Sequence, residues 1–188
     1  MEQTTFLYMK TSTKERARIN ALYQLEILDT PPDGSFNKMT ELAAKIFNVP
    51  IALITMVDTD RIWFKSHFGI DDEKIDRENG LCSSAILAED VYLVEDARKD
   101  PRCLANSLVS GSFGLQFYAA APLTTKDGYN LGTFCIIDKR PRYINSDQQD
   151  MLKQMASIVM DEIELRLQSR KIIKEYNQLL KERQEAIN

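Results

Sequence analysis

Residues 114–138 read GLQFYAAAPLTTKDGYNLGTFCIID, two largely apolar runs separated by a short polar turn. Aromatic and β-branched residues in both runs are typical of buried strands. Lys126, Asp127 and Gly128 lie between the runs and form a turn signal. We therefore predict a β-hairpin here, and the remaining elements are assigned outward from it.

A second pair of strands is predicted upstream, where IALITMV (51–57) precedes RIWFKSHFGI (61–70) across a turn at 58–60. The second stretch holds the only Trp and the only His of the chain. Strict alternation divides it into an aromatic-polar side, suited to a ligand pocket, and a Phe-rich side, suited to the core. The first side comprises Arg61, Trp63, Lys65 and His67, and the second Ile62, Phe64, Ser66 and Phe68.

Two helices are predicted before these strands. Thr13 is a candidate cap for a helix over 14–28, which DTPPDG then ends. Ser35 precedes a second amphipathic helix over 36–47. The apolar anchors are Ile19, Leu22, Leu25 and Ile27 in the first helix, and Phe36, Met39, Leu42, Ala43 and Ile46 in the second.

The middle of the chain predicts short elements. GLCSSAIL (80–87) suggests a short helix, and VYLVED (91–96) a short strand. Asp100 and Pro101 suit the cap and the first position of another short helix.

Ser146 is expected to cap a helix that runs from Asp147 to the last residue without Gly or Pro. Apolar residues recur in it at every seventh position, which favours a coiled coil over a solvated helical tail. We expect its first turns to pack on the domain and the chain to continue into an output domain. The packing residues would be Met151, Leu152, Met155, Ile158 and Val159; the heptad rows are Ile158, Leu165, Ile172 and Leu179, and Ile173, Leu180 and Ile187.

This order of elements predicts an α+β fold with a central antiparallel sheet. The N- and C-terminal helices would cover one face, and short helices would cover a ligand pocket on the other. The predicted organisation is a flexible N-terminus over 1–13, a sensor domain over 14–168 and a coiled-coil-like signalling helix over 169–188.

Composition and charge argue against several classes of function. A net charge of −4 without a basic tract argues against nucleic acid binding. The apolar runs are too short to span a membrane, and the polar N-terminus predicts a cytoplasmic protein. Three widely spaced cysteines and a single His argue against a disulfide framework and a metal site.

The sequence resembles GAF domains of bacterial signalling proteins over roughly residues 16–168. The segments that carry the resemblance are 25–70, LCSSAI (81–86), VEDARKDPR (94–102) and FYAAAPLTTKDGYNLGTFCIIDKRPR (117–142). The resemblance implies a sensor whose small ligand alters a parallel homodimer. The last helix is similar to those that lead from GAF domains to diguanylate cyclases, which we favour as the output enzyme, or histidine kinases.

Nucleotide-binding GAF domains share a motif that this chain matches in degenerate form. Asp138-Lys139, Tyr143 and Asp147-Gln148 stand at its positions. The resemblance implies that a Lys139–Asp147 contact supports the pocket without touching the ligand. The alternative is a plain turn followed by a helix N-terminus, where Asp147 is favoured electrostatically.

The expected regulatory ligand is therefore a cyclic nucleotide, with cyclic AMP favoured over cyclic GMP and no covalent cofactor. Its phosphate would use helix N-terminal amides at 80–87 and 100–106, with charge from Arg98 and Arg102. Candidate ligand-binding residues are Leu53, His67, Phe68, Leu81, Cys82, Ser83, Arg102, Cys103, Leu104, Leu108, Phe113 and Gln116.

Each of these assignments has an alternative, either a purely structural role or another function. Leu81, Leu104 and Leu108 could be core residues, and His67 a structural one. The whole domain could be a dimerisation module whose pocket is vestigial and filled by Phe113 or Phe117. A thiol enzyme resembling the free methionine sulfoxide reductases, using Cys82 and Cys103, is the catalytic alternative. Haem and bilin binding have no supporting residues beyond His67 and Cys82.

Overall fold

A computed structural model describes residues 12–187, in which one antiparallel sheet has the strand order β3-β2-β1-β6-β5-β4. The predicted hairpin forms its centre, with Ala120 of β5 opposite Cys135 of β6, and β1 pairs with the other edge of β6. The predicted flexible segment 1–13 lies outside the described residues except for its last two. The strands are β1 Ile51–Val57, β2 Arg61–Phe68, β3 Lys74–Asp76, β4 Tyr92–Val94, β5 Phe117–Thr124 and β6 Asn130–Asp138.

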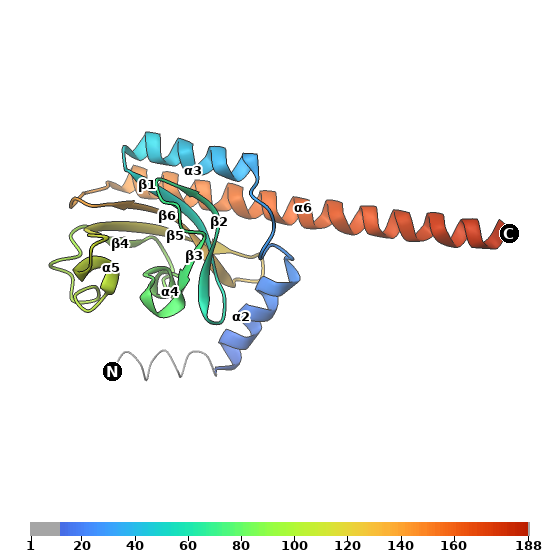
Figure 1. The fold of residues 1–188 in the computed structure, drawn as a ribbon, viewed down its shortest axis with the longest axis horizontal. Helices are drawn as coiled ribbons and strands as arrows, with labels where there is room; N and C mark the ends of the chain where they lie inside the picture. Colours follow the sequence, from blue (N-terminus) through green and yellow to red (C-terminus); the bar gives the residue numbers. More distant parts are fainter. Residues whose placement is uncertain (1–11, 188) are drawn as a thin grey trace.

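The two faces of the sheet have different covers (Figure 1). Helices α3 (Gly34–Phe47) and α6 (Ser146–Ile187) lie side by side over one face, which we call the helix face. Shorter elements, namely η1 (Arg77–Asn79), α4 (Cys82–Ala85) and α5 (Ser107–Ser110), lie over the other, which we call the loop face. The predicted α+β layering is therefore confirmed.

Each face has its own apolar core, because alternate residues of a strand point to opposite faces. Neighbouring residues of β6 illustrate the division, since Ile136 packs in the helix-face core and Ile137 in the loop-face core. Phe117 is fully buried on the helix face, so it does not fill a pocket on the loop face.

The predicted alternation along β2 is wrong beyond Phe64, because the pairing of β1 with β2 contains a β-bulge. Thr55 pairs with Phe64 but Ile54 pairs with Ser66, so Lys65 is the extra residue. Before the bulge, Trp63 packs in the helix-face core and Phe64 in the loop-face core, so Trp63 lies away from the predicted pocket and Phe64 lies on the pocket side.

After the bulge, the alternation of side chains along β2 is shifted by one residue. Ser66 hydrogen-bonds to Thr40 of α3 at 2.9 Å, on the helix face. His67 stands opposite Leu53 and so faces the loop side, whereas Phe68 stands opposite Ala52 on the helix side. His67 and Trp63 therefore lie on different faces of the sheet.

The helices begin at other residues than predicted. Ser12, not Thr13, caps α2 (Thr13–Gln24) by accepting from Glu15 N, and Asp33 caps α3. Asn145, not Ser146, caps α6, and it shares reciprocal hydrogen bonds with Gln148 in a capping box. In each case a better side-chain acceptor stands one or two residues earlier in the chain.

The segment around Asp100 forms a turn and not the predicted helix. Cys103 N donates to Asp100 O at 2.9 Å, and a one-turn helix forms only afterwards as α5, capped by Asn106. The two short helices on this face are each four residues long.

Several predicted packing residues are exposed instead of buried. On α3, Leu42 keeps 55% of its surface exposed and Ile46 is also exposed, whereas Thr40, Ala44 and Phe47 are buried. On α6, Leu152, Val159 and Ile163 face the sheet, while Met151 and Ile158 face outward. The exposed Met151 lies seven residues before Ile158 and so extends the heptad row toward the start of α6.

Helix α2 is anchored by a buried ion cluster. Glu15 accepts two bonds from Arg18, at 2.7 and 2.8 Å, and pairs with Arg77 Nη1 at 2.8 Å. Burial opposes ionisation of Glu15, but the two arginines outweigh it and lower its pKa. Because Arg77 Nη1 also donates to Asp58 O at 2.8 Å, the cluster links α2 to the β1–β2 turn and to η1.

Helix α6 leaves the domain near residues 25–33, which connect α2 to α3 (Figure 1). Arg166 pairs with Asp33, the cap of α3, and its guanidinium lies 4.8 Å from the Phe36 ring centroid. Arg170 donates to Leu25 O at 2.9 Å. These contacts fix the direction in which α6 extends from the sheet. Among residues 12–187, no helix combines the length and the apolar character that crossing a bilayer requires.

Candidate functional site

The loop face contains a buried group of polar side chains beneath α4. Tyr118 of β5 donates its hydroxyl to Cys82 Sγ at 3.2 Å, and Cys135 of β6 is buried in the same core. Thr55 and Thr133 bridge β1 and β6 through their hydroxyls, 2.9 Å apart, on the same face of the sheet. We call these five residues the loop-face cluster.

The loop-face cluster perturbs the ionisation of its members. Hydrogen bonding from Cys135 lowers the pKa of Cys82, against the effect of burial and with help from Thr133 and Tyr118. Burial raises the pKa of Cys135 and of Tyr118. Cys82 is therefore the thiol of the pair that ionises more readily.

Four members of the loop-face cluster were not predicted as site residues: Tyr118, Thr55, Thr133 and Cys135. All four stand in strands, where aromatic and β-branched residues are expected for their propensity alone. Strand alternation in the sequence could have identified them, because Tyr118, Thr133 and Cys135 all point to one face of the sheet once the hairpin register is set.

The predicted pocket residues divide into walls and rim. The wall residues lie in the loop-face core, where their apolar contacts also fit the alternative of plain packing. Ser83 donates to Arg77 O at 2.8 Å, and Gln116 contributes its backbone, with its N–H donating to Asp138 O at 3.0 Å. The wall residues are Leu53, Leu81, Cys82 and Cys103, with Leu108 and Phe113 partly buried against them.

The rim holds the more exposed candidates. His67 Nδ1 lies 2.8 Å from Ile70 O, so one ring nitrogen is engaged by the chain itself. Leu104 keeps 57% of its surface exposed and is not a core residue. Phe68 is half-exposed on the opposite side of β2, so the structure does not bring it together with His67.

Two cations stack on aromatic rings at the edge of the loop face. The Arg102 guanidinium lies 4.6 Å from the Tyr92 ring centroid, and Lys139 Nζ lies 5.2 Å from that of Phe113. Arg102 also donates to Leu93 O at 2.8 Å and pairs with Asp100, whose hydrogen bond raises the pKa of Arg102.

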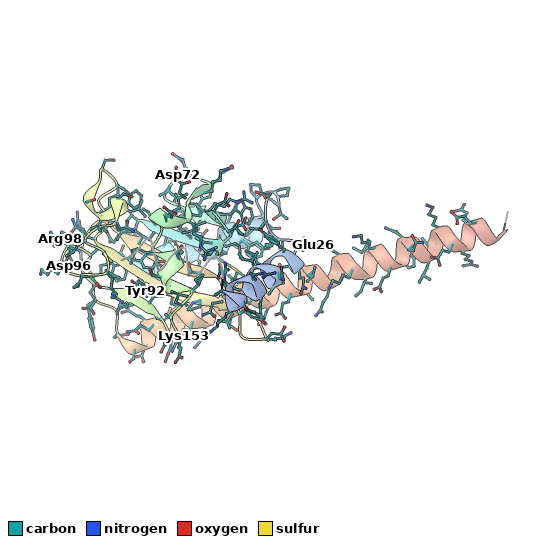
Figure 2. The ribbon with its side chains drawn as sticks, turned by 90° about the horizontal axis from the view of Figure 1, so that it is seen from below. Glu26, Asp72, Tyr92, Asp96, Arg98 and Lys153 are labelled. Atoms are coloured by element: carbon teal, nitrogen blue, oxygen red, sulfur yellow. The ribbon has the colours of Figure 1, made fainter. Side chains whose placement is uncertain are left out.

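Arg98 is less well placed than Arg102 to supply charge to a ligand on the loop face. It pairs with Asp96 at 2.9 Å, and Figure 2 shows this pair at the end of the domain away from the free part of α6, apart from Tyr92. Arg102 is thus the better candidate of the two predicted charges.

The motif residues are arranged differently from the expectation. Buried Asp138 pairs with Arg142, and Lys139 contacts the Phe113 ring. The ion pairs formed within residues 12–187 do not include the expected one between Lys139 and Asp147. Asp147 stands in the first turn of α6, as the alternative interpretation predicts, and Tyr143 keeps 76% of its surface exposed.

Two cavities among the described residues lie away from the predicted pocket. One, of about 330 Å³, lies along the end of α2 and is lined by Leu22, Tyr23 and Ile27. Another, of about 400 Å³, lies between β5 and α6, beside Lys126 and Lys153. Beneath α4 the space between helix and sheet is filled by the buried loop-face core.

The two cysteines of the reductase alternative, Cys82 and Cys103, both lie in the loop-face core. Cys103 lies in the turn after Asp100, and burial raises the pKa of its thiol to about 11, which disfavours the reactive thiolate. Among the described residues, no cluster of His, Cys, Asp or Glu is arranged to hold a metal ion.

The sheet carries long helices on one face and short helices over a polar cluster on the other, and comparison with known proteins identifies the family with this architecture. The family model described as "GAF domain" matches residues 31–163. This chain belongs to the GAF family and is a sensory or regulatory domain of the kind found in bacterial signalling proteins.

A relative and several solved structures agree with this assignment. The chain is 38% identical over 150 residues to the cyclic di-GMP phosphodiesterase PA2567 of Pseudomonas aeruginosa; the match covers 79% of this chain and 26% of that protein. The chain thus spans only about a quarter of that relative.

Similar solved structures establish the fold alone, since all are below 25% identity. A GAF domain from Geobacter sulfurreducens has a TM-score of 0.58 at 18% identity, covering 80% of this chain and 97% of that one. The free methionine-R-sulfoxide reductase of Neisseria meningitidis has a TM-score of 0.60 at 16% identity, covering 85% and 95%. The PixJ GAF domain of Thermosynechococcus elongatus has a TM-score of 0.60 at 12% identity, covering 88% and 96%.

Proposed function

We propose that this GAF domain binds a cyclic nucleotide, cyclic AMP ahead of cyclic GMP, on its loop face and regulates an attached output enzyme. The observation that carries the proposal is the loop-face cluster itself. Buried polar groups lie there under a helix of only four residues, with cation–aromatic pairs at the edge.

The chemistry of these groups suits a nucleotide. A cyclic nucleotide has one negative charge and an aromatic base, so it needs a cation and a flat apolar surface. Arg102 over Tyr92 and Lys139 over Phe113 supply both at the rim. The hydroxyls of Tyr118 and Thr133 below could hydrogen-bond to the base or the ribose.

Binding requires α4 to move, because the space beneath it is filled. A short helix bounded by turns opens at a lower free energy than a long packed helix does. A ligand that binds only the open arrangement shifts the population toward it. The same opening would displace η1, which is tied to α2 through Arg77 and Glu15.

The output signal would travel through a parallel dimer. Ile158 keeps 54% of its surface exposed, and the heptad row continues along α6 with every member exposed. Leu42 and Ile46 add exposed apolar surface on the neighbouring α3. Apolar residues repeating every seven positions are suited to a partner helix, and a second copy of this chain supplies an identical row. The row comprises Met151, Ile158, Leu165, Ile172 and Leu179.

The proposed output enzyme acts in cyclic di-GMP turnover, with a diguanylate cyclase as the first choice. The relative that supports this acts as a phosphodiesterase on the same second messenger. This chain spans 26% of that protein, so we propose that the output activity resides outside the domain described here.

Isothermal titration with cyclic AMP and cyclic GMP tests the binding proposal. Cyclic AMP should release heat and raise the melting temperature, and Arg102→Gln should weaken binding by roughly tenfold or more, as loss of a charged hydrogen bond does. Arg98→Gln is the matched control, because Arg98 lies away from Tyr92. The absence of both binding heat and a melting shift at millimolar cyclic nucleotide would contradict the proposal.

One observation favours a second candidate, a dimerisation module with a closed pocket. The members of the loop-face cluster already satisfy one another, and the space under α4 is occupied. This candidate predicts dimerisation through α6 without a response to either nucleotide, so the titration separates the two.

A further inference from the structure

We propose that Lys65, the extra residue of the β2 bulge, fixes the direction of α6 by holding in place the segment that connects α2 to α3. This segment comprises residues 25–33, and we call it the connector; α6 leaves the domain beside it (Figure 1). The inference rests on the proposed role of α6 in output, but it concerns the domain without nucleotide.

The ammonium of Lys65 is buried against the connector and is satisfied there by neutral groups. Its Nζ donates to Thr30 Oγ1 at 2.8 Å and to Pro31 O at 2.9 Å. The same Nζ lies 5.4 Å from the ring centroid of Phe36 and 5.9 Å from that of Trp63. Burial disfavours the charged amine and lowers its pKa, so these contacts largely offset the cost of desolvation. Their main effect is to give the connector a fixed position.

The β-bulge places two consecutive side chains of β2 on the helix face. Ser66 hydrogen-bonds to Thr40 of α3 at 2.9 Å, and Lys65 reaches the connector. Strict alternation would have turned one of the two to the opposite face. Phe64, which directly precedes them, packs in the loop-face core. The bulge therefore joins the loop-face core to the connector through neighbouring residues of one strand.

Helix α6 holds the two ends of the connector. Arg166 pairs with Asp33, and its guanidinium lies 4.8 Å from the Phe36 ring centroid. Phe36 thus contacts one cation from β2 and one from α6. Arg170, about one turn further along α6, donates to Leu25 O at 2.9 Å. The connector is therefore bound to α6 at its ends and to β2 in its middle.

The direction of α6 beyond the domain depends on these contacts. Residues 168–185 of α6 are exposed, so within one chain no packing further along the helix corrects its direction. A connector that loses its middle anchor can shift, and it then takes its bonds to Arg166 and Arg170 with it. Loss of the Lys65 contacts should therefore widen the range of directions in which α6 points.

Pulsed electron spin resonance on the chain without nucleotide measures this direction. Spin labels at Asp127→Cys, in the β5–β6 turn, and at Lys181→Cys, on the free part of α6, occupy exposed positions, whereas the native cysteines are buried. An excess of unlabelled chain leaves only distances within one chain. Lys65→Met should raise the fraction of molecules outside the main distance of the parent by about tenfold, as loss of hydrogen bonds to a charged group does. Lys45→Met is the matched control, because Lys45 is an exposed lysine of α3, and it should leave the distribution unchanged.

Two further measurements separate a positioning role from a purely structural one. The melting temperature of Lys65→Met should stay within about 5 °C of the parent, because methionine keeps the packing and removes a buried cation. Arg166→Gln should also displace α6, since it breaks the next link between β2 and α6. The double variant should displace α6 no further than the stronger single variant, because the two residues act in series.

Thr30→Val decides the question if Lys65→Met does not fold. It removes one acceptor of Lys65 from the half-buried connector and should increase the displaced fraction severalfold. An unchanged distance distribution in Lys65→Met (or in Thr30→Val in its place), an equal displacement by Lys45→Met, or additive effects in the double variant would overturn the proposal. A chain that binds no nucleotide would leave these results unchanged, so this proposal and the nucleotide proposal fail separately.

Discussion

The two faces of this sheet are built from the same strands but covered in opposite ways. On the helix face, α3 and the first half of α6 lie on an apolar core, and fixed contacts such as Arg166 with Asp33 hold them. On the loop face, four-residue helices and turns lie on a core that contains hydroxyls and thiols. This difference fits the proposal that the helix face serves structure and transmission and the loop face serves recognition.

The largest expected effect compares adjacent isoleucines on β6. Ile136→Ala creates a cavity under long helices that cannot collapse, so it should cost about 3–4 kcal/mol of unfolding free energy. Ile137→Ala should cost about 2 kcal/mol, because short elements of the loop face can relax into the space. Urea unfolding measures both, and a larger cost for Ile137→Ala would contradict the contrast between the faces.

The next effect concerns association. Leu165→Glu places a charge in the exposed heptad row and should weaken the proposed dimer by more than about tenfold, while changing monomer stability by less than about 0.5 kcal/mol. Lys174→Glu introduces the same residue on α6 outside the row and should leave the dimer intact. Sedimentation equilibrium provides the measurement, and equal effects from both variants would mean that the row is only a solvated surface.

A smaller effect is expected from Tyr118→Phe on the loop face. Removing the hydroxyl takes one hydrogen bond from Cys82 Sγ without creating a large cavity, so about 1 kcal/mol of stability should be lost. Tyr129→Phe is a control, because Tyr129 packs beside the helix-face core and offers no hydroxyl to Cys82. Thermal unfolding of the two variants gives the comparison, and the account fails if their losses are the same.

The smallest expected effect concerns the ion pair between Arg166 and Asp33, where α6 leaves the domain. Hydrogen bonding from Arg166 lowers the pKa of Asp33 from 3.8 to about 2. Since the folded pKa lies below the unfolded one, this stabilisation is fully present above about pH 4 and is lost as the pH falls toward 2. Asp33→Asn keeps a good helix cap but removes the charge, and should cost about 0.5–1 kcal/mol at neutral pH.

The pH dependence supplies the control for this last variant. The difference in unfolding free energy between Asp33→Asn and the parent should shrink between about pH 4 and pH 2, as Asp33 of the parent protonates. A difference that stays constant over this range would assign the effect to the cap and not to the ion pair.

The sequence predicted the hairpin, the layering and the family because these depend on long patterns. The apolar runs of 114–138 and the KDG turn leave few alternatives for β5 and β6. The last helix was equally clear, since no Gly or Pro interrupts it after Ser146.

The site was harder to predict, because it depends on single-residue shifts. The bulge at Lys65 reverses the sides of β2, and nothing in RIWFKSHFGI marks the extra residue. Tyr118, Thr55 and Thr133 have the character of ordinary strand residues, and only the register brings them to the loop face, where Tyr118 donates to Cys82. Leu42 and Ile46 fit a core stripe by spacing, yet the helix turns them outward.

The most direct test of the contrast between the two faces is hydrogen–deuterium exchange with and without saturating cyclic AMP. The account predicts that amides in α4 and in residues 101–116 change their protection most, while α3 and the sheet-packed half of α6 change little. A change confined to α3 and α6, or no change on the loop face at saturating nucleotide, would contradict it.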